Sequence, residues 1–271
     1  MNKLYYLATK SLLVISIFIF VACGTNNPIS KPKHNTSIAI TKAHGSSSYE
    51  QYKIWLHELD SNIIIYDLYG LSLDSAKSVM KNVDGLLLSG GPDINPKLYG
   101  EDSMEYICET PDNYRDSLEL QSIDYAYKNK IAILGICRGL QLTNVYFGGS
   151  LINDIPSQIN STIIHRGDTN IAYHNINIVN KTYFKSLYDY DSAWVNSSHH
   201  QAIKKLGHNL KILAFANDSI IESIGLKDNN YPNFFLAVQF HPEHLGSNNE
   251  LAIVIGKTFI GSARIINQER K

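Results

Sequence analysis

The segment Lys130-Ile-Ala-Ile-Leu-Gly-Ile-Cys-Arg-Gly-Leu-Gln-Leu-Thr-Asn144 decides the fold. It begins with an apolar run, residues 131–136, of the kind found in a strand that is buried on both faces. The chain then turns through Cys137. After the turn, apolar side chains from Leu140 to Tyr146 recur at a spacing that suits one broad helix face. The segment therefore predicts a strand, a sharp turn and a helix.

Cys137 stands between Gly135 and Gly139 at this turn. This arrangement is the thiol version of the G-x-S-x-G nucleophile elbow, in which small residues allow backbones to crowd around a sharp corner. The corner would push the thiol out over the sheet, and the helix N-terminus would favour a thiolate. The alternative interpretation is a buried structural cysteine at the end of a strand.

The length and composition are those of a globular protein. The 271 residues allow one sizeable α/β domain or two small ones, with 44% hydrophobic and 18% charged residues. The formal net charge of -1 argues against a nucleic-acid-binding protein, which usually carries a basic surface.

The N-terminal residues have the pattern of an export signal. Lys3 and Lys10 precede an apolar run, residues 12–22, which is too short to span a bilayer. The run leads into Val21-Ala-Cys-Gly24, which resembles the signal of a bacterial lipoprotein, whose cysteine is acylated. We therefore expect a signal peptide over residues 1–22 and lipidation at Cys23. An ordinary secretory signal and an uncleaved anchor are the alternatives.

This leader implies where the protein resides. We expect it to be exported and lipid-anchored to a bacterial membrane, on the periplasmic or cell-surface side. Residues 23–35 are polar, contain two prolines and predict a flexible tether. Residues 36–271 show no internal repeat or second boundary, so we expect a single domain there.

Strands alternate with helices through the first half of that domain. Strands are expected at residues 36–41, 62–66, 84–90 and 131–136, and helices at 49–59, 73–83 and within 110–129. This alternation predicts an α/β fold with a mostly parallel central sheet flanked by helices. Ligands bind outside the carboxyl ends of the strands in such sheets, where Ser89-Gly-Gly-Pro92 and Cys137 both fall.

The pattern changes after Gly149 and predicts a small antiparallel portion. Apolar and polar residues alternate over residues 171–179, as in a strand, and residues 193–196 suit a short strand. Residues 211–216 and 220–224 flank Asn217-Asp218 as an antiparallel hairpin. Residues 235–240 form another expected strand and 250–265 a closing helix.

A second informative stretch is Gln239-Phe-His-Pro-Glu243. The preceding strand would deliver His241 to the sheet edge, and Glu243 would lie on the same side two residues later. A carboxylate beside an imidazole orients it and stabilises the imidazolium. A surface histidine beside a turn is the alternative for this stretch alone. Together with Cys137, it makes a coherent Cys–His–Glu triad.

The third stretch is the loop Ser89-Gly-Gly-Pro-Asp93. A glycine pair at a strand end lets backbone N–H groups face a ligand. With the N–H of Arg138, the residue after the nucleophile, it would supply an oxyanion hole. A tight turn without a ligand is the alternative.

These motifs together resemble the class I glutamine amidotransferase-like superfamily, and within it the γ-glutamyl-γ-aminobutyrate hydrolase family of γ-glutamyl hydrolase-type cysteine peptidases. Further stretches agree in the same order along the chain: Asn95-Pro-Lys-Leu-Tyr-Gly100, Tyr114-Arg-Asp116 with Glu119, residues 141–154, and Val195-Asn-Ser-Ser-His-His-Gln201. The resemblance covers roughly residues 36–265. It implies a flavodoxin-like three-layer sandwich.

The resemblance also implies a role for individual residues. Cys137 would be the nucleophile, His241 the general acid and base, and Glu243 the residue that orients it. Gly91 and Arg138 would supply the oxyanion N–H groups. The residues expected to bind the γ-glutamyl substrate are Gly90, Gln141, Ser198, His199, His200 and Gln201. No metal and no cofactor is expected.

The expected reaction is hydrolysis of a γ-glutamyl amide through a γ-glutamyl thioester. A glutaminase subunit that releases ammonia from glutamine and a non-catalytic binding lipoprotein are alternatives on the same scaffold. A metal hydrolase using His199, His200, His241 and His244 is disfavoured because the sequence has no spaced metal signature. The leaving amine, the role of Cys108 and the oligomeric state, including a homodimer, stay open.

Overall fold

The computed structural model describes residues 35–168, 170–179, 182–228 and 231–269. The expected signal peptide, Cys23 and the expected tether up to residue 34 lie outside these ranges. Within them, no helix is long and apolar enough to cross a membrane. The described residues form one compact unit.

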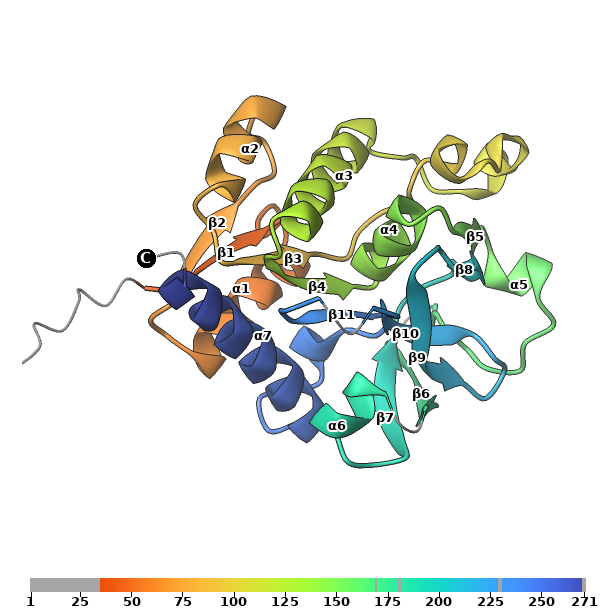
Figure 1. Cartoon of the computed structure of the whole chain (residues 1–271). Coiled ribbons are helices and arrows are strands. Elements are labelled where there is room, and N and C mark those ends of the chain that lie inside the picture. The colour runs from red at the N-terminus through yellow and green to blue at the C-terminus, as the bar shows by residue number, and fades with distance from the viewer. Residues whose placement is uncertain (1–34, 169, 180–181, 229–230, 270–271) are drawn as a thin grey trace, which may run out of the picture. The chain divides into compact units, whose positions relative to one another are not determined.

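Figure 1 shows a central sheet with helices on both of its faces. The strands are β1 (Ser37–Ile40), β2 (Ile64–Asp67), β3 (Gly85–Leu88), β4 (Ala132–Ile136), β5 (Ser150–Ile152), β6 (Ala172–Ile178), β7 (Ser192–Ser197), β8 (Ala202–Lys205), β9 (Leu210–Ala216), β10 (Ile221–Leu226) and β11 (Phe235–Val238). The helices are α1 (Ser47–Leu59), α2 (Leu73–Met80), α3 (Asn113–Lys128), α4 (Arg138–Tyr146), α5 (Ile155–Gln158), α6 (Tyr183–Leu187) and α7 (Glu250–Glu269). Three short 3₁₀ helices complete the described elements: η1 (Pro96–Tyr99), η2 (Asp102–Ile107) and η3 (Pro242–His244).

The main sheet has nine strands in the order β2-β1-β3-β4-β11-β10-β9-β6-β7. The pairs from β2 to β11 are parallel, and the pairs from β11 to β7 are antiparallel. The predicted α/β fold is confirmed, including the antiparallel portion and the hairpin of β9 and β10. Strand β4, which ends just before Cys137, lies between the parallel strands β3 and β11.

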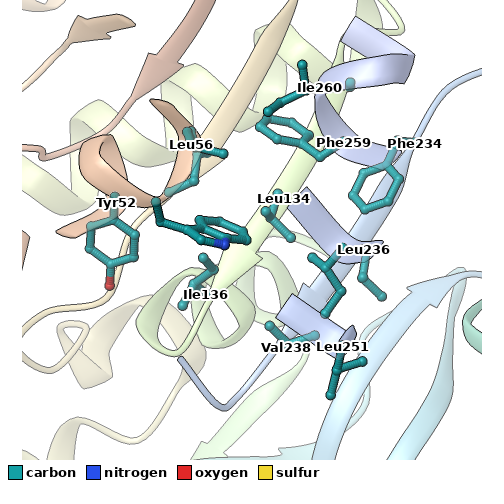
Figure 2. Close-up of a cluster of buried hydrophobic side chains, with 14 of the residues drawn as sticks. Tyr52, Leu56, Leu134, Ile136, Phe234, Leu236, Val238, Leu251, Phe259 and Ile260 are labelled. Atoms are coloured by element: carbon teal, nitrogen blue, oxygen red, sulfur yellow. The ribbon is translucent and has the colours of Figure 1, made fainter. Parts of the chain in front are cut away.

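Two layers of helices bury the sheet. In Figure 1, α2, α3 and α4 lie over one face, while α1 and α7 lie over the other. Figure 2 shows the second layer, in which Leu56 of α1 and Phe259 of α7 pack against Leu134 and Ile136 of β4. Ile133 of β4, and Ile131 just before the strand, point the other way and pack with side chains of α3 and α4. Burial on both faces explains why this strand is continuously apolar.

The sequence did not predict several short elements. Strands β5 and β8 form a separate two-stranded antiparallel sheet. In β8, Ala202 and Ile203 are buried while Lys204 and Lys205 are exposed. These four residues do not show the alternation of apolar and polar side chains that indicates a strand. Helices α5 and α6 span only four and five residues. Elements this short lack the repeated apolar spacing that identifies longer helices.

Candidate active site

Cys137 occupies the predicted elbow between β4 and α4. Its backbone has φ 52° and ψ -105°, a conformation that a residue with a side chain seldom adopts. The neighbouring backbones are packed closely, because a Cβ atom added to Gly139 would lie 2.2 Å from the carbonyl oxygen of Leu88. Only glycine fits there, which accounts for the glycine two residues after the cysteine. The strained turn presents the thiol at the carboxyl end of the sheet.

This strain predicts that the elbow lowers the stability of the fold. Cys137→Gly should have a free energy of unfolding about 1 kcal/mol higher than Cys137→Ala, because glycine relieves roughly 1–3 kcal/mol of backbone strain and gives back part of it as unfolded-state entropy. Thermal or urea unfolding of the two inactive variants compares them directly. Equal stability, or a less stable glycine variant, would show that the elbow carries no such strain.

His241 reaches the same edge from the neighbouring strand β11. Val238 pairs with Ile136 in the sheet, and the Cys137 N–H donates to the Val238 carbonyl oxygen at 2.8 Å. The side chain of Asn196 holds the His241 backbone on both sides. Its Oδ1 accepts from the His241 N–H and its Nδ2 donates to the His241 carbonyl oxygen, each at 2.8 Å. The histidine is therefore fixed by two strand ends and one amide side chain.

Glu243 lies directly behind the imidazole of His241. Its Oε1 is 2.6 Å from His241 Nδ1, and its side chain is completely buried. Burial alone would lower the pKa of His241, but the charges of Glu243 and of the Cys137 side chain raise that pKa well above its usual value of 6.5. The three predicted triad residues are thus brought together, with the imidazole between the sulfur and the carboxylate.

The two residues predicted to supply oxyanion N–H groups, Gly91 and Arg138, lie near Cys137: Gly91 lines both pockets that Cys137 lines, and Arg138 follows Cys137 directly. Arg138 is the first residue of α4, so its N–H has no partner within the helix. Gly91 has φ +155°, and a Cβ there would lie 2.0 Å from Nη1 of Arg115. The N–H of Gly90 instead donates to the Tyr52 hydroxyl at 2.9 Å, and Gly90 lines neither pocket beside Cys137.

A buried charge network supports this loop. Nη2 of Arg115 donates to the carbonyl oxygens of Ser89 and Gly90 at 3.0 and 2.6 Å. Nε of Arg115 donates to Glu119 at 2.8 Å, and the Arg138 guanidinium pairs with both Glu119 and Asp116. Arg138 Nε also donates to the Pro92 carbonyl oxygen at 2.8 Å. The network fixes the glycine loop and the start of α4 relative to each other.

Cys137 lies between two pockets. A small pocket of about 70 Å³ has a polar and charged lining, which consists of Gly91, Asp93, Glu109, Cys137, Gln141, Arg166, Ser198, His199, His200 and Gln201. A larger pocket of about 340 Å³ is lined by Ser48, Gly91, Cys137, Ile171, Asn196, Ser198, His241 and His244. The two pockets share Gly91, Cys137 and Ser198. A reacting bond at the sulfur can therefore extend in both directions.

The predicted substrate-binding residues other than Gly90 all line the small pocket. Gln141 is buried and donates from Nε2 to the Gln201 carbonyl oxygen at 3.2 Å. His200 bridges Asp93 and Asp154 at 3.1 Å each, and its hydrogen bond to Asp93 raises its pKa. His199 is different because its Nε2 points to buried Glu222, 3.6 Å away.

Sequence reasoning missed several residues of this site. Glu109 and Arg166 both line the small pocket and form an ion pair there, with 2.8 Å between Arg166 Nη1 and Glu109 Oε1, and no motif marked either of them. Asp93 also lines the small pocket, although the sequence marks it only as the last residue of the glycine loop. Cys108, whose role was open, lies behind the pocket, where its sulfur accepts from Gln201 Nε2 at 3.5 Å and contacts Asn153.

Comparisons with known proteins agree with this geometry. Residues 67–243 match the family described as Peptidase C26, a span that includes Cys137, His241 and Glu243. The glutamine amidotransferase-like protein YvdE of Lactococcus lactis is 40% identical over 173 residues, which cover 63% of this chain and 70% of that protein. The γ-glutamyl-γ-aminobutyrate hydrolase PuuD of Escherichia coli K12 is 31% identical over 193 residues, covering 68% and 73%.

A solved structure shows the same fold. The glutaminase domain of Trypanosoma brucei CTPS, solved with bound acivicin, superposes with a TM-score of 0.58 at 19% identity, over 84% of this chain and 94% of that one. The resemblance inferred from the motifs is therefore confirmed at the level of family and fold. The chain belongs to the peptidase C26 family of glutamine amidotransferase-like proteins.

Proposed function

We propose that this protein is a cysteine hydrolase that cleaves the γ-glutamyl amide bond of a small γ-glutamyl compound. The observation that carries the proposal is the position of Cys137, between a small charged pocket and a larger, less charged one. Two comparisons support the proposal: the chain belongs to a peptidase family, and it is 31% identical to a γ-glutamyl-γ-aminobutyrate hydrolase. The small pocket would hold the γ-glutamyl group and the larger pocket the amine that leaves.

The proposed reaction has two steps, in which Cys137 first forms a thioester and water then hydrolyses it. The Cys137 thiolate attacks the γ-carbonyl carbon, and the N–H groups of Gly91 and Arg138 stabilise the negative oxygen of the tetrahedral intermediate. The His241 imidazolium protonates the leaving amine, and the C–N bond breaks to leave a γ-glutamyl thioester. Neutral His241 then removes a proton from water, which attacks the thioester and releases glutamate. Glu243 orients His241 and stabilises its charged form throughout.

The lining of the small pocket suits an amino-acid head group. A γ-glutamyl unit carries an ammonium and a carboxylate on the same carbon atom. Asp93 and Glu109 offer carboxylates for the ammonium, and the Arg166 guanidinium offers paired donors for the carboxylate. Gln141 and Ser198 line the same pocket and add polar groups to it. A pocket of this kind would bind the γ-glutamyl group in the same way whichever amine is attached to it.

The larger pocket favours substrates with a substantial leaving group. Ammonia from glutamine would leave most of the 340 Å³ volume unfilled. Ile171, Asn196 and His244 offer a mixed apolar and polar wall to a small organic amine instead. This size difference is the reason to prefer hydrolysis of a γ-glutamyl amide over the alternative, a glutaminase subunit that supplies ammonia to a synthetase.

Arg166→Gln tests head-group recognition. We expect KM for a γ-glutamyl amide to rise about tenfold, with kcat little changed, because a charge-assisted hydrogen bond at a partly exposed position is lost. Arg264→Gln is the matched control, since Arg264 also forms an exposed ion pair, with Asp60, away from both pockets. Steady-state kinetics decide the matter. An unchanged KM in Arg166→Gln would remove Arg166 from the binding site.

A substrate panel tests the function itself. Full-length protein should release the amine from γ-glutamyl amides of small amines with kcat/KM well above that for ammonia release from glutamine. An α-linked glutamyl dipeptide should not be cleaved, because its reacting carbonyl lies on the α-carbon. Faster turnover of glutamine than of every γ-glutamyl amide would favour the glutaminase alternative. Binding without any turnover would favour the non-catalytic alternative.

We further propose export and membrane anchoring through a lipid on Cys23. The support is the sequence of residues 1–24. In a bacterial host, the wild-type chain should fractionate with membranes and incorporate labelled fatty acid, whereas Cys23→Ala should do neither. Fatty-acid labelling that persists in Cys23→Ala, or a wild-type chain found only in the cytoplasm, would contradict this proposal.

A further inference from the structure

Three histidines and one glutamate from four separate segments meet inside the antiparallel half of the sheet. His165 comes from the connection between α5 and β6, His174 from β6, His199 from the turn after β7, and Glu222 from β10. All four side chains are buried, with exposures of 4%, 5%, 3% and 0% respectively. The proposed reaction uses none of them as an acid, a base or a nucleophile.

Their polar atoms converge on one point. His165 Nδ1, His174 Nε2 and His199 Nε2 lie 3.6, 3.1 and 3.6 Å from the same oxygen, Oε1 of Glu222. In a tetrahedral Zn²⁺ site with bonds of about 2.0–2.1 Å, neighbouring ligand atoms are about 3.3–3.4 Å apart. The three observed distances fall on both sides of that value. The ligand atoms of His165, His174 and Glu222 also lie within 4.8 Å of one another, close enough to hold one ion. His199 lies outside that group of three and meets it through Glu222.

These atoms have no other partners in the described part of the chain. His165 Nδ1, His174 Nε2, His199 Nε2 and both carboxylate oxygens of Glu222 are buried without a hydrogen bond of acceptable geometry. Unpaired polar atoms are rare inside proteins because each loses its hydration without replacement. A bound cation would satisfy the three nitrogens and the carboxylate at once.

In two of the histidines, the ring nitrogen that points away from Glu222 has a hydrogen-bond partner, as is common for histidines that bind a metal. His165 Nε2 lies 2.8 Å from Oδ2 of Asp218, and His199 Nδ1 lies 2.9 Å from the Gln201 carbonyl oxygen. A metal-bound histidine commonly donates its second N–H to a carboxylate or a backbone carbonyl, which fixes the ring and its tautomer. In both rings this leaves the lone pair of the inner nitrogen directed at the centre.

The charge of the group also suits a cation. Neutral imidazoles and a carboxylate are the forms of these side chains that bind metal. The Glu222 side chain is completely buried, and a divalent cation would balance its negative charge.

We propose that His165, His174 and Glu222 bind a divalent transition-metal ion, with His199 Nε2, 3.6 Å from Glu222 Oε1, available as the fourth ligand and Zn²⁺ the best match in ligand type. Four protein ligands would leave no open coordination position, so the ion would have a structural role rather than a catalytic one. The ligands flank residues of the small pocket: His165 precedes Arg166, and His199 lies between Ser198 and His200. The ion would fix these residues around the substrate.

Metal analysis of purified full-length protein tests the proposal. Wild-type protein from zinc-supplemented cells should contain about one equivalent of metal by plasma mass spectrometry, and His174→Gln and Glu222→Gln should contain less than a tenth as much. His208→Gln, an exposed histidine in the same half of the chain, is the matched control. His244→Gln is a second control, because His241, Glu243 and His244 also lie close enough together to hold an ion. Both controls should keep their metal.

A second measurement covers the case in which the ligand variants do not fold. Removing the metal from wild-type protein with a chelator should lower its Tm, and added Zn²⁺ should restore it. Folded wild-type protein that contains no metal and takes up neither Zn²⁺ nor Co²⁺ would overturn the proposal. Loss of metal in His244→Gln but not in His174→Gln would also overturn it, because the ion would then lie at the catalytic histidine.

Discussion

Cys137→Ala is expected to abolish hydrolysis of γ-glutamyl amides, lowering kcat by about 10⁵-fold or more. The substitution removes the atom that attacks the carbonyl and leaves the pockets and the backbone donors in place. Alanine keeps the Cβ of the strained residue, so the elbow should retain its shape. KM or the dissociation constant for the substrate should change little. Kinetics and direct binding measurements on the same preparation separate the two effects.

Cys108→Ala is the matched control for this variant. Cys108 lies near the small pocket without lining it, and its sulfur contacts Asn153 and Gln201 rather than a reacting group. We expect this variant to keep most of the wild-type kcat. If Cys137→Ala turned substrate over at the wild-type rate, or only Cys108→Ala lost activity, Cys137 would not be the nucleophile.

Glu243→Gln is expected to lower kcat by about 10³–10⁴-fold and to change the pH profile. The buried Glu243 carboxylate lies 2.6 Å from His241 Nδ1 and helps to raise the pKa of His241 well above 6.5. In the wild type, His241 should therefore remain a proton donor at neutral pH, and activity should fall only as the pH rises through that raised pKa. Without the carboxylate the pKa falls, so the alkaline limb should move to lower pH.

Glu109→Gln separates this effect from a general loss of negative charge near the site. Glu109 lies in the small pocket and pairs with Arg166, and it does not contact His241. Its variant should raise KM and leave the alkaline limb of kcat where it is in the wild type. An alkaline limb in Glu243→Gln identical to that of the wild type would contradict the role assigned to the carboxylate.

The sequence predicted the parts of the site that local geometry determines. The strand before Cys137 is continuously apolar because α3 and α4 cover one face and α1 and α7 the other. The glycine at 139 is required by the closeness of the Leu88 carbonyl. The sequence predicted the pairing of His241 and Glu243 from an extended chain, but Glu243 lies in the 3₁₀ helix η3, and this turn brings its carboxylate to the imidazole. Each of these relations involves residues close together in the chain or at adjacent strand ends.

Other parts of the site arise only from tertiary contacts. Glu109 and Arg166 meet across 57 positions of sequence, with no motif to link them. The Gly90 N–H donates to the Tyr52 hydroxyl of α1, so it is not directed at a substrate. His165, His174, His199 and Glu222 come from four segments, so no short spacing marks them as a group. The sequence led us to expect no metal for this reason.

The central claim is that Cys137 forms a γ-glutamyl thioester, and mass spectrometry of acid-quenched enzyme tests it most directly. Wild-type protein mixed with a γ-glutamyl amide should gain the mass of one glutamyl group, and peptide mapping should place it on Cys137. Cys137→Ala should gain nothing under the same conditions. The claim would be contradicted if the amine were released without any adduct at any time point, or if the adduct mapped to another residue.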